Sequence, residues 1–303
     1  MTTPASLRLL AAAVASALLA ACGGGGTPAG STATTAAATA TSGAQVAAGT
    51  ITGFGSVIVD GVRYDDAGAT VKSEDDAASP RTVSLSDLKL GMQVEVKADD
   101  AGRATLVTIS SEVLGRIASI STTGFTVAGQ DVRISTDPAS PTVYEGVAGL
   151  SGLAVNDLVE VHGTRDAAGA VLASRVERKD PAATVSIRVV GTVAGLDATA
   201  QSFRLGGLTV RWDAATRLLP TGIAPADGQR VAVWTDAAIG ADGTVLAKSI
   251  VVRRSGLANN DAARIGGLVR SLDFGSKRFK VDGVDVDASA ASFAKGTASD
   301  LAD

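Results

Sequence analysis

The segments Phe125-Thr-Val-Ala-Gly129-Gln-Asp-Val132, Phe203-Arg-Leu-Gly-Gly207-Leu-Thr-Val210 and Phe279-Lys-Val-Asp-Gly283-Val-Asp-Val286 share one pattern. A fourth segment, Val57-Ile-Val-Asp-Gly61-Val-Arg-Tyr64, has Val in place of the leading Phe. In each segment, apolar and polar residues alternate on both sides of a glycine, which is typical of two short strands joined by a tight turn. The sequence therefore predicts one β-hairpin that recurs four times.

Two further features recur around this hairpin. A strand led by glycine precedes it, at Gly49-Thr-Ile-Thr-Gly, Gly115-Arg-Ile-Ala-Ser-Ile, Gly191-Thr-Val-Ala-Gly-Leu and Gly267-Leu-Val-Arg-Ser-Leu. A second strand pair follows the first three copies, and its first strand reads Val94-Glu-Val-Lys97, Val159-Glu-Val-His162 or Val231-Ala-Val-Trp234. An Asp/Gly turn leads from that strand into the closing strand. The repeat is about 65 to 75 residues long.

The order of the predicted elements is strand, strand, strand, a short helical or irregular connection, strand, strand. This is the order of an OB-type five-stranded barrel. Small barrels also suit a chain with 35 Gly and only 3% aromatic residues, because their interiors need little aromatic filling. We expect an all-β fold of tandem small five-stranded barrels, OB-like with the order β-β-β-(α)-β-β. Small open sandwiches with the same strand order are the alternative.

The repeats define the expected domain organisation. It comprises a signal peptide at 1–21, a flexible tether at 22–48, barrel repeats at 49–113, 115–178 and 188–254, and a partial repeat at 265–303. The last repeat is incomplete, because the sequence ends where the earlier repeats enter their second strand pair. Either this repeat is truncated or a partner supplies the missing strands.

The repeated motifs resemble those of the bacterial family catalogued as domain of unknown function 5666. The resemblance rests on the Gly-x-[Ile/Val] start, the Phe-x-Val-x-Gly hairpin and the Gly-x-x-Val-Glu-Val strand, and it covers most of residues 49–254 and part of 265–303. It implies a lipid-anchored protein with tandem domains. It implies no activity and no catalytic residue, because none is established for the family as a whole.

The N-terminus predicts export and lipidation. Arg8 precedes an apolar run from Leu9 to Ala21, which has the length of a signal-peptide core and is too short to span a bilayer. The run ends in Leu19-Ala-Ala-Cys22, which resembles the lipobox of bacterial lipoproteins, so Cys22 is the expected lipidation site. Gly23 at the next position implies the outer membrane, facing the periplasm or the surface. The uncharged Gly, Thr, Ser and Ala residues that follow predict a flexible tether.

Candidates for catalysis and for metal binding are few. One Cys and one His in 303 residues exclude most zinc sites and a disulfide framework. His162 points outward on its strand, opposite to Val159 and Val161. No Ser or Asp lies at a spacing that would indicate a catalytic triad, so we expect a solvated residue at the strand end and not a general base. The acidic clusters match no calcium loop, so we expect no metal, no cofactor and no enzymatic activity.

The charge is unevenly distributed between the repeats. Residues 49–113 carry 6 basic and 11 acidic residues, whereas residues 188–254 carry 8 basic and 5 acidic residues together with both Trp residues. Trp212 is in the inward phase, and Trp234 is in the outward phase. An exposed Trp234 with Arg211 and Arg230 would form a ligand-binding surface through stacking and cation–π contacts. A Trp234 covered at a seam between repeats is the alternative.

The sequence thus predicts a non-catalytic lipoprotein of the cell envelope, with tandem β-barrels as a binding or spacer module. The alternative function is a carbohydrate- or peptide-binding module centred on the third repeat, and a hydrolase that uses His162 comes third. We expect a membrane contact through the lipid, and an envelope protein or glycan as partner. We expect no nucleic-acid binding, because an acidic chain with a net charge of −4 neutralises phosphates poorly. The oligomeric state stays open.

Overall fold

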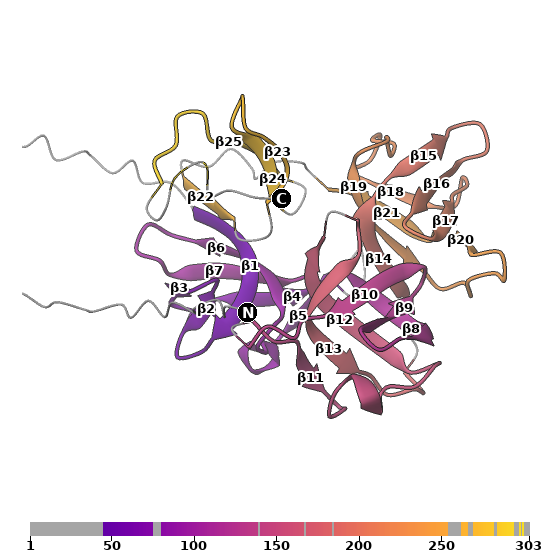
Figure 1. The fold of residues 1–303 in the computed structure, drawn as a ribbon, viewed down its shortest axis with the longest axis horizontal. Coiled ribbons are helices and arrows are strands. Elements are labelled where there is room, and N and C mark those ends of the chain that lie inside the picture. Colours follow the sequence, from indigo (N-terminus) through magenta and orange to yellow (C-terminus); the bar gives the residue numbers. More distant parts are fainter. Residues whose placement is uncertain are drawn as a thin grey trace, which may run out of the picture. The chain divides into compact units, whose positions relative to one another are not determined.

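The computed structural model describes residues 45–74, 80–138, 140–166, 168–183, 185–253, 262–265, 269–281, 284–293, 297 and 299. Its named elements within these ranges are β-strands and two short 3-10 helices (Figure 1). The predicted all-β class is therefore confirmed. The predicted signal peptide, Cys22 and most of the predicted tether lie outside the described residues.

The described part of the first repeat contains seven strands and one 3-10 helix. These are β1 (Gln45–Gly53), β2 (Val57–Val59), β3 (Val62–Tyr64), β4 (Thr70–Ser73), β5 (Arg81–Val83), the 3-10 helix η1 (Leu85–Asp87), β6 (Gln93–Ala98) and β7 (Ala104–Ile109). They are ordered β3-β2-β1-β6-β7-β4-β5 in one sheet. Strand β1 includes the last four residues of the predicted tether, 45–48, because Val46 and Ala47 are buried and pair with β6.

The described part of the second repeat has six strands in a similar arrangement. It consists of β8 (Val113–Ile120), β9 (Gly124–Val127), β10 (Gln130–Ile134), β11 (Val143–Glu145), the 3-10 helix η2 (Leu150–Gly152), β12 (Leu158–Arg165) and β13 (Val171–Arg178). Strand β12 lies between β8 and β13, with which it pairs antiparallel. Strand β13 in turn pairs in parallel with β10 and β11. The segments η1 and η2 occupy the place of the predicted short helix.

The third repeat is divided between two sheets. Its strands are β14 (Ile187–Thr192), β15 (Ala194–Asp197), β16 (Ser202–Leu205), β17 (Leu208–Arg211), β18 (Arg217–Leu219), β19 (Arg230–Thr235), β20 (Thr244–Leu246) and β21 (Ser249–Val252). Strands β15, β16, β17 and β20 form a separate four-stranded sheet, while β14, β19, β21 and β18 continue the sheet of the second repeat.

The last part of the chain supplies four short strands. These are β22 (Ala262–Ile265), β23 (Val269–Asp273), β24 (Arg278–Val281) and β25 (Val284–Asp287). Strands β23, β24 and β25 form a three-stranded sheet that includes the predicted fourth hairpin. Strand β22 pairs in parallel with the start of β1.

The glycine at the centre of the repeated motif makes the predicted turn. In the first hairpin Asp60 and Gly61 have φ angles of +46° and +78°, and in the second hairpin Ala128 and Gly129 have φ angles of +49° and +70°. Two successive residues of positive φ are typical of the two-residue type I′ turn, whose twist matches that of the flanking strands. The recurring glycine is therefore a requirement of the hairpin.

The prediction of separate, closed five-stranded barrels is wrong. The repeats are arranged as the stacked coils of a β-solenoid, and sheets pass from one repeat into the next. Val113 of β8 pairs with Val189 of β14, so that one sheet of ten strands includes strands of both repeats. Such pairing covers strand edges that a separate repeat would leave exposed. Strand order along the chain could not reveal it, because the pairing joins different repeats.

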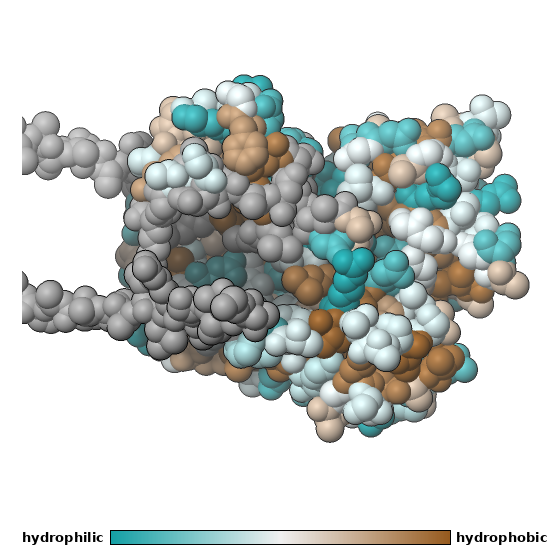
Figure 2. All heavy atoms as spheres, in the orientation of Figure 1, coloured by the Kyte–Doolittle hydropathy of each residue, from teal (hydrophilic) through white to brown (hydrophobic). Residues whose placement is uncertain are grey.

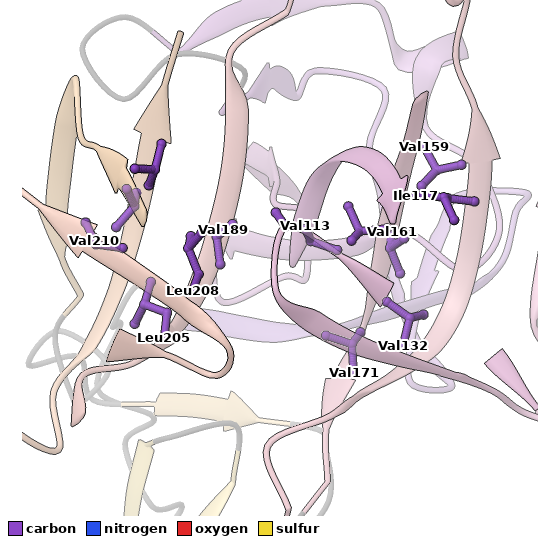
Figure 3. Packing of buried hydrophobic residues seen from close by; sticks show 14 of the residues in the cluster. Val113, Ile117, Val132, Val159, Val161, Val171, Val189, Leu205, Leu208 and Val210 are labelled. Atoms are coloured by element: carbon purple, nitrogen blue, oxygen red, sulfur yellow. The ribbon is translucent and has the colours of Figure 1, made fainter. Parts of the chain in front are cut away.

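The hydrophobic core, like the ten-stranded sheet, extends from one repeat into the next. One cluster of buried residues extends through the second and third repeats, and a separate cluster fills the first repeat. Figure 3 shows Val113, Val132, Val161 and Val171 of the second repeat turned toward one another. Leu205 and Leu208 of the third repeat belong to the same cluster. Hydrophobic burial, at about 25 cal/mol per Å² of apolar area, thus stabilises these two repeats jointly.

Strands β12 and β19 are buried on both faces. Val159 and Val161 of β12 contribute to the core, yet the alternate residues Glu160 and His162 are also buried. The same holds for β19, where Ala232 and Trp234 alternate with Val231 and Val233. A strand buried on both faces is covered by a second layer. The contacts of these outward residues identify that layer.

Candidate functional site

The outward face of β19 carries Trp234 into a seam between repeats. Its ring is 2% exposed, and its Nε1 donates a hydrogen bond to the carbonyl oxygen of Glu74 at 3.3 Å. The guanidinium of Arg188 lies 5.2 Å from the ring centroid, which is within the range of a cation–π contact. The outward phase was predicted, but the first repeat covers this face and the ring is not exposed to solvent.

The structure does not bring the other two predicted ligand-binding residues to Trp234. Arg230 begins β19 and is engaged by Glu112, while Arg211 is exposed on β17 of the four-stranded sheet. Trp212 packs against the core, with its ring centroid 5.6 Å from that of Phe203. An aromatic surface centred on Trp234 is therefore not formed.

His162 is fully buried, contrary to the expectation of a solvated residue. Its Nδ1 lies 3.3 Å from the backbone nitrogen of Gln93 and 3.2 Å from the carbonyl oxygen of Ser110. Its Nε2 lies 3.9 Å from Oε1 of Glu160. Burial lowers the pKa of His162 and outweighs the opposing effect of Glu160. The imidazole is thus a neutral contact between the first and second repeats.

Glu112 connects the second repeat to the third. It directly precedes β8, and its carboxylate accepts a hydrogen bond from Nε of Arg165 at 3.0 Å and another from Arg230. Burial alone would raise the pKa of Glu112, but the two arginines outweigh this effect and lower it. A buried carboxylate held between guanidinium groups stays ionised.

Glu74 connects the first repeat to the third in the same way. Its carboxylate accepts a hydrogen bond from Arg188 at 2.9 Å and another from Arg253. Arg188 is 3% exposed and also donates to the hydroxyls of Ser110 at 2.9 Å and Ser111 at 3.1 Å. Burial opposes ionisation of Glu74, yet Arg253 and Arg188 lower its pKa. We call these buried contacts the seam: Glu74, Gln93, Ser110, Ser111, Glu112, His162, Arg165, Arg188, Arg230, Trp234 and Arg253.

A second polar group adjoins the seam in the second repeat. Nζ of Lys179 lies 2.7 Å from Oε2 of Glu160 and 2.7 Å from Oε1 of Glu177. Burial raises the pKa of Glu160, but His162 and Lys179 lower it more strongly, to about 2. Arg175 forms ion pairs with Glu145 and Glu177. These side chains approach a cavity of about 760 Å³, which has walls from the first and second repeats.

The sequence predicts a seam only as the alternative in which Trp234 is covered, and it does not predict the ion pairs found there. The first repeat is rich in acidic residues and the third in basic residues, which was read as an indication of a ligand. In the structure, some of these opposite charges neutralise each other, because Glu74 of the first repeat pairs with Arg188 and Arg253 of the third repeat. Complementary charge between repeats, compared pairwise, could have predicted that the repeats contact one another.

Two features are absent from the described residues. No group of three or more His, Cys, Asp or Glu side chains in these ranges is arranged to hold a metal ion. No helix in the described part of the chain has the length and apolar character needed to cross a membrane.

Comparison with known families identifies the repeats. The family model for a domain of unknown function, DUF5666, matches residues 115–177 and again residues 190–251. These two segments of the chain are therefore similar to DUF5666 domains. They coincide with the second and third repeats, and the shared sheet and core join one segment to the other. No curated protein and no solved structure matches the chain at a significant level.

Proposed function

We propose that this protein is a non-catalytic lipoprotein of the bacterial cell envelope, in which the DUF5666 repeats act as a rigid spacer. The N-terminal sequence supports the anchor, because an apolar run ends at Cys22 and an uncharged segment follows it. The lipid would hold the chain at the membrane, and Gly23 after the lipidated residue favours the outer membrane. The tether would separate the repeats from the membrane surface.

The observation that carries the spacer proposal is the pair of carboxylates in the seam, of which Glu112 is buried and Glu74 is half-buried. Glu74 and Glu112 are each held by arginines that belong to other parts of the stack. Separating the repeats would break these ion pairs and would expose the apolar core that the second and third repeats share. Independent domains joined by flexible linkers would not form such ion pairs between repeats. The seam therefore supports a fixed geometry.

A binding role centred on the third repeat is less well supported. That proposal depended on an exposed Trp234, whose ring is enclosed by Arg188 and the backbone of Glu74. The face in Figure 2 shows hydrophilic and hydrophobic residues interspersed among the described residues. A spacer requires only that the repeats keep their relative positions.

Labelling of cells with a palmitate analogue tests the anchor. The natural chain is expected to incorporate the label and to fractionate with the envelope, while Cys22→Ser loses the label and the membrane association. The Asp100→Asn variant, changed at an exposed turn, serves as the matched control and keeps both. Unchanged labelling of Cys22→Ser would contradict the lipoprotein assignment.

Limited proteolysis tests the rigid module separately. Trypsin is expected to leave the first three repeats in one resistant fragment that ends at Arg254, because Lys179, a potential cleavage site between the second and third repeats, is held by Glu160 and Glu177. Rapid release of a separate second or third repeat, detected by mass spectrometry, would contradict the spacer proposal even if the anchor were correct.

A further inference from the structure

The four-stranded sheet of the third repeat, formed by β15, β16, β17 and β20, has one buried face and one outer face. The residues buried in the core are Phe203 and Leu205 of β16 and Leu208 and Val210 of β17. The residues between them point to the outer face, because side chains alternate along a strand. The outer face includes neither Trp234 nor any other residue of the seam, so the inference below goes beyond the spacer proposal.

Two arginines lie on this outer face. Arg204 of β16 pairs with Thr209 of β17, and Ser202 pairs with Arg211, two residues further along. The two arginines are therefore diagonal neighbours, which lie roughly 7–8 Å apart across an antiparallel strand pair. Both arginines are exposed, and the hydroxyl residues Ser202 and Thr209 are partly exposed beside them. The face thus presents two guanidinium groups and two hydroxyls together.

The charge of these arginines is not neutralised within the sheet. Across the part of the chain that the structure describes, no carboxylate lies within ion-pair distance of either guanidinium. That of Arg204 extends toward β15, where a Cβ at Gly195 would lie 3.7 Å from its Nε. Asp197, the acidic residue of these four strands, accepts hydrogen bonds from the backbone nitrogens of Thr199 and Ala200 at 2.9 Å and 2.8 Å. The outer face therefore keeps an excess of positive charge.

The equivalent face of the second repeat is neutralised by the chain itself. Arg133 stands there in the place of Arg211, and its guanidinium lies 2.7 Å from the carboxylate of Asp166. Gly240 of the third repeat stands in the place of Asp166. Both residues begin the same turn, in which their backbone nitrogens donate to a carbonyl oxygen four residues later, at 2.8 Å for Asp166 and 2.9 Å for Gly240. The third repeat thus has a cation without the carboxylate that pairs with it in the second repeat.

The hairpin strands show the same contrast. Thr209 stands where the second hairpin has Asp131 and the fourth hairpin has Asp285. In the fourth hairpin, Lys280 takes the place of Arg204 and forms an ion pair with Asp285. The third hairpin therefore combines a cation with a neutral residue at the position that supplies the carboxylate elsewhere. Its unpaired charge is complementary to an anion from outside the chain.

The chemistry of this face favours an acidic polysaccharide among polyanions. Guanidinium groups pair with carboxylates through two parallel hydrogen bonds, and the hydroxyls of Ser202 and Thr209 both donate to and accept from sugar hydroxyls. Single-stranded nucleic acids stack their bases on aromatic side chains, and the strand residues of this outer face include none. Recognition of an anionic membrane takes a cluster of about four to eight basic residues. Two arginines are too few for it.

We infer that the outer face of this sheet binds the carboxylates of an acidic polysaccharide, with Arg204 and Arg211 as the charged contacts. Because both side chains are exposed, the attraction is screened by salt and the affinity falls as the ionic strength rises. A neutral polysaccharide lacks the charged group that the two guanidinium groups select.

Calorimetric titration of the full chain with an oligogalacturonate tests the inference. The methyl ester of the same oligosaccharide has the same sugars without free carboxylates and is expected to bind about tenfold more weakly. Equal affinity for the two, or no saturable binding of the free acid, would overturn the inference. Polyphosphate and phosphatidylglycerol vesicles are the competing polyanions. Tighter binding of either, lost on substitution of both arginines by Gln, would overturn the assignment to a polysaccharide.

Three variants with the same change in net charge locate the site. Arg204→Gln removes one contact, and Thr209→Asp places beside Arg204 the carboxylate that the second repeat has there. Each is expected to weaken binding of the oligogalacturonate about tenfold. Arg133→Gln is the matched control and is expected to keep the affinity, because Asp166 already pairs with that arginine. Circular dichroism checks that the variants fold.

Two outcomes of this series would contradict the site. Equal weakening by all three variants would show that net charge alone governs binding, and natural affinity in both Arg204→Gln and Thr209→Asp would place the site elsewhere. Neither outcome affects the spacer proposal, because none of the three positions belongs to the seam.

Discussion

At the residue scale, His162 makes the stability of the fold depend on pH. It is the single histidine of the chain, and it is fully buried against Gln93 and Ser110 of the neighbouring repeat. Its pKa is lowered in the folded state, so the unfolded state binds a proton more readily below the ordinary value of 6.5. By linkage, the contribution of His162 is present above pH 6.5 and declines as the pH falls toward its lowered pKa.

The first prediction concerns this window. The free energy of unfolding of the natural chain, measured by urea denaturation, is expected to fall between pH 7 and pH 5. His162→Gln removes the titrating group and is expected to flatten this dependence, although its stability at pH 7 is lower. Glu160, with a pKa of about 2, loses its contribution only below pH 4.5 and leaves this window unaffected. An equal slope in both proteins would contradict the account.

The sequence predicts the orientation of single residues better than their surroundings. Alternation along β12 and β19 correctly placed His162 and Trp234 on the face opposite to Val161 and Val233. It could not show that this face is covered, because burial there comes from a repeat far away in the chain. The predicted exposure of His162 was therefore wrong, whereas the covered Trp234 agrees with the alternative of a seam between repeats.

At the scale of elements, two turn glycines of the first repeat differ in whether they contact the second repeat. Gly91 and Gly102 of the first repeat have similar φ angles, +81° and +75°. A Cβ at Gly91 would lie 2.6 Å from the carbonyl oxygen of Ser174 on β13, whereas a Cβ at Gly102 would meet nothing within 4 Å. The two positions thus share backbone strain and differ in the contact with the second repeat.

The second prediction compares these two glycines. Gly102→Ala is expected to destabilise the fold by about 1–2 kcal/mol, the cost of a left-handed alanine. Gly91→Ala adds a clash with the backbone of β13 and is expected to cost a further 1–3 kcal/mol. Urea denaturation at pH 7 measures both. If Gly91→Ala were no more destabilising than Gly102→Ala, the close approach of the two repeats would be incorrect.

The hairpins were predictable because their cause is local. At Asp60-Gly61 and at Ala128-Gly129, about ten consecutive residues contain both strands of the hairpin and the turn that pairs them. The pairing of Val113 with Val189 involves residues of two different repeats, and a pattern of alternating Val is compatible with several partners. The expectation of separate barrels failed at this step.

At the scale of the whole molecule, the seam makes the repeats depend on one another. Glu112 lies between Arg165 of its own repeat and Arg230 of the next repeat. An isosteric amide at this position cannot neutralise either guanidinium. The loss would therefore affect both repeats that resemble DUF5666 domains and not only the one that carries the substitution.

The third prediction follows from this dependence. Glu112→Gln is expected to reduce the free energy of unfolding by about 3–5 kcal/mol, because it leaves buried arginines without their carboxylate. Asp100→Asn, at an exposed turn, is expected to leave the stability unchanged within error. Calorimetry of both variants measures the difference. A loss for Glu112→Gln no greater than that of the control would show that the ion pairs do not stabilise the seam.

The central claim is that the repeats form one rigid body, and a distance distribution tests it most directly. Spin labels are placed on exposed turns of the first and third repeats by Asp100→Cys and Ala198→Cys, with Cys22→Ser to remove the native thiol. Double electron–electron resonance is expected to give one narrow distance distribution, which Glu74→Gln broadens by breaking the contact with Arg188 and Arg253. A broad distribution in the protein with an intact seam would contradict the rigid spacer.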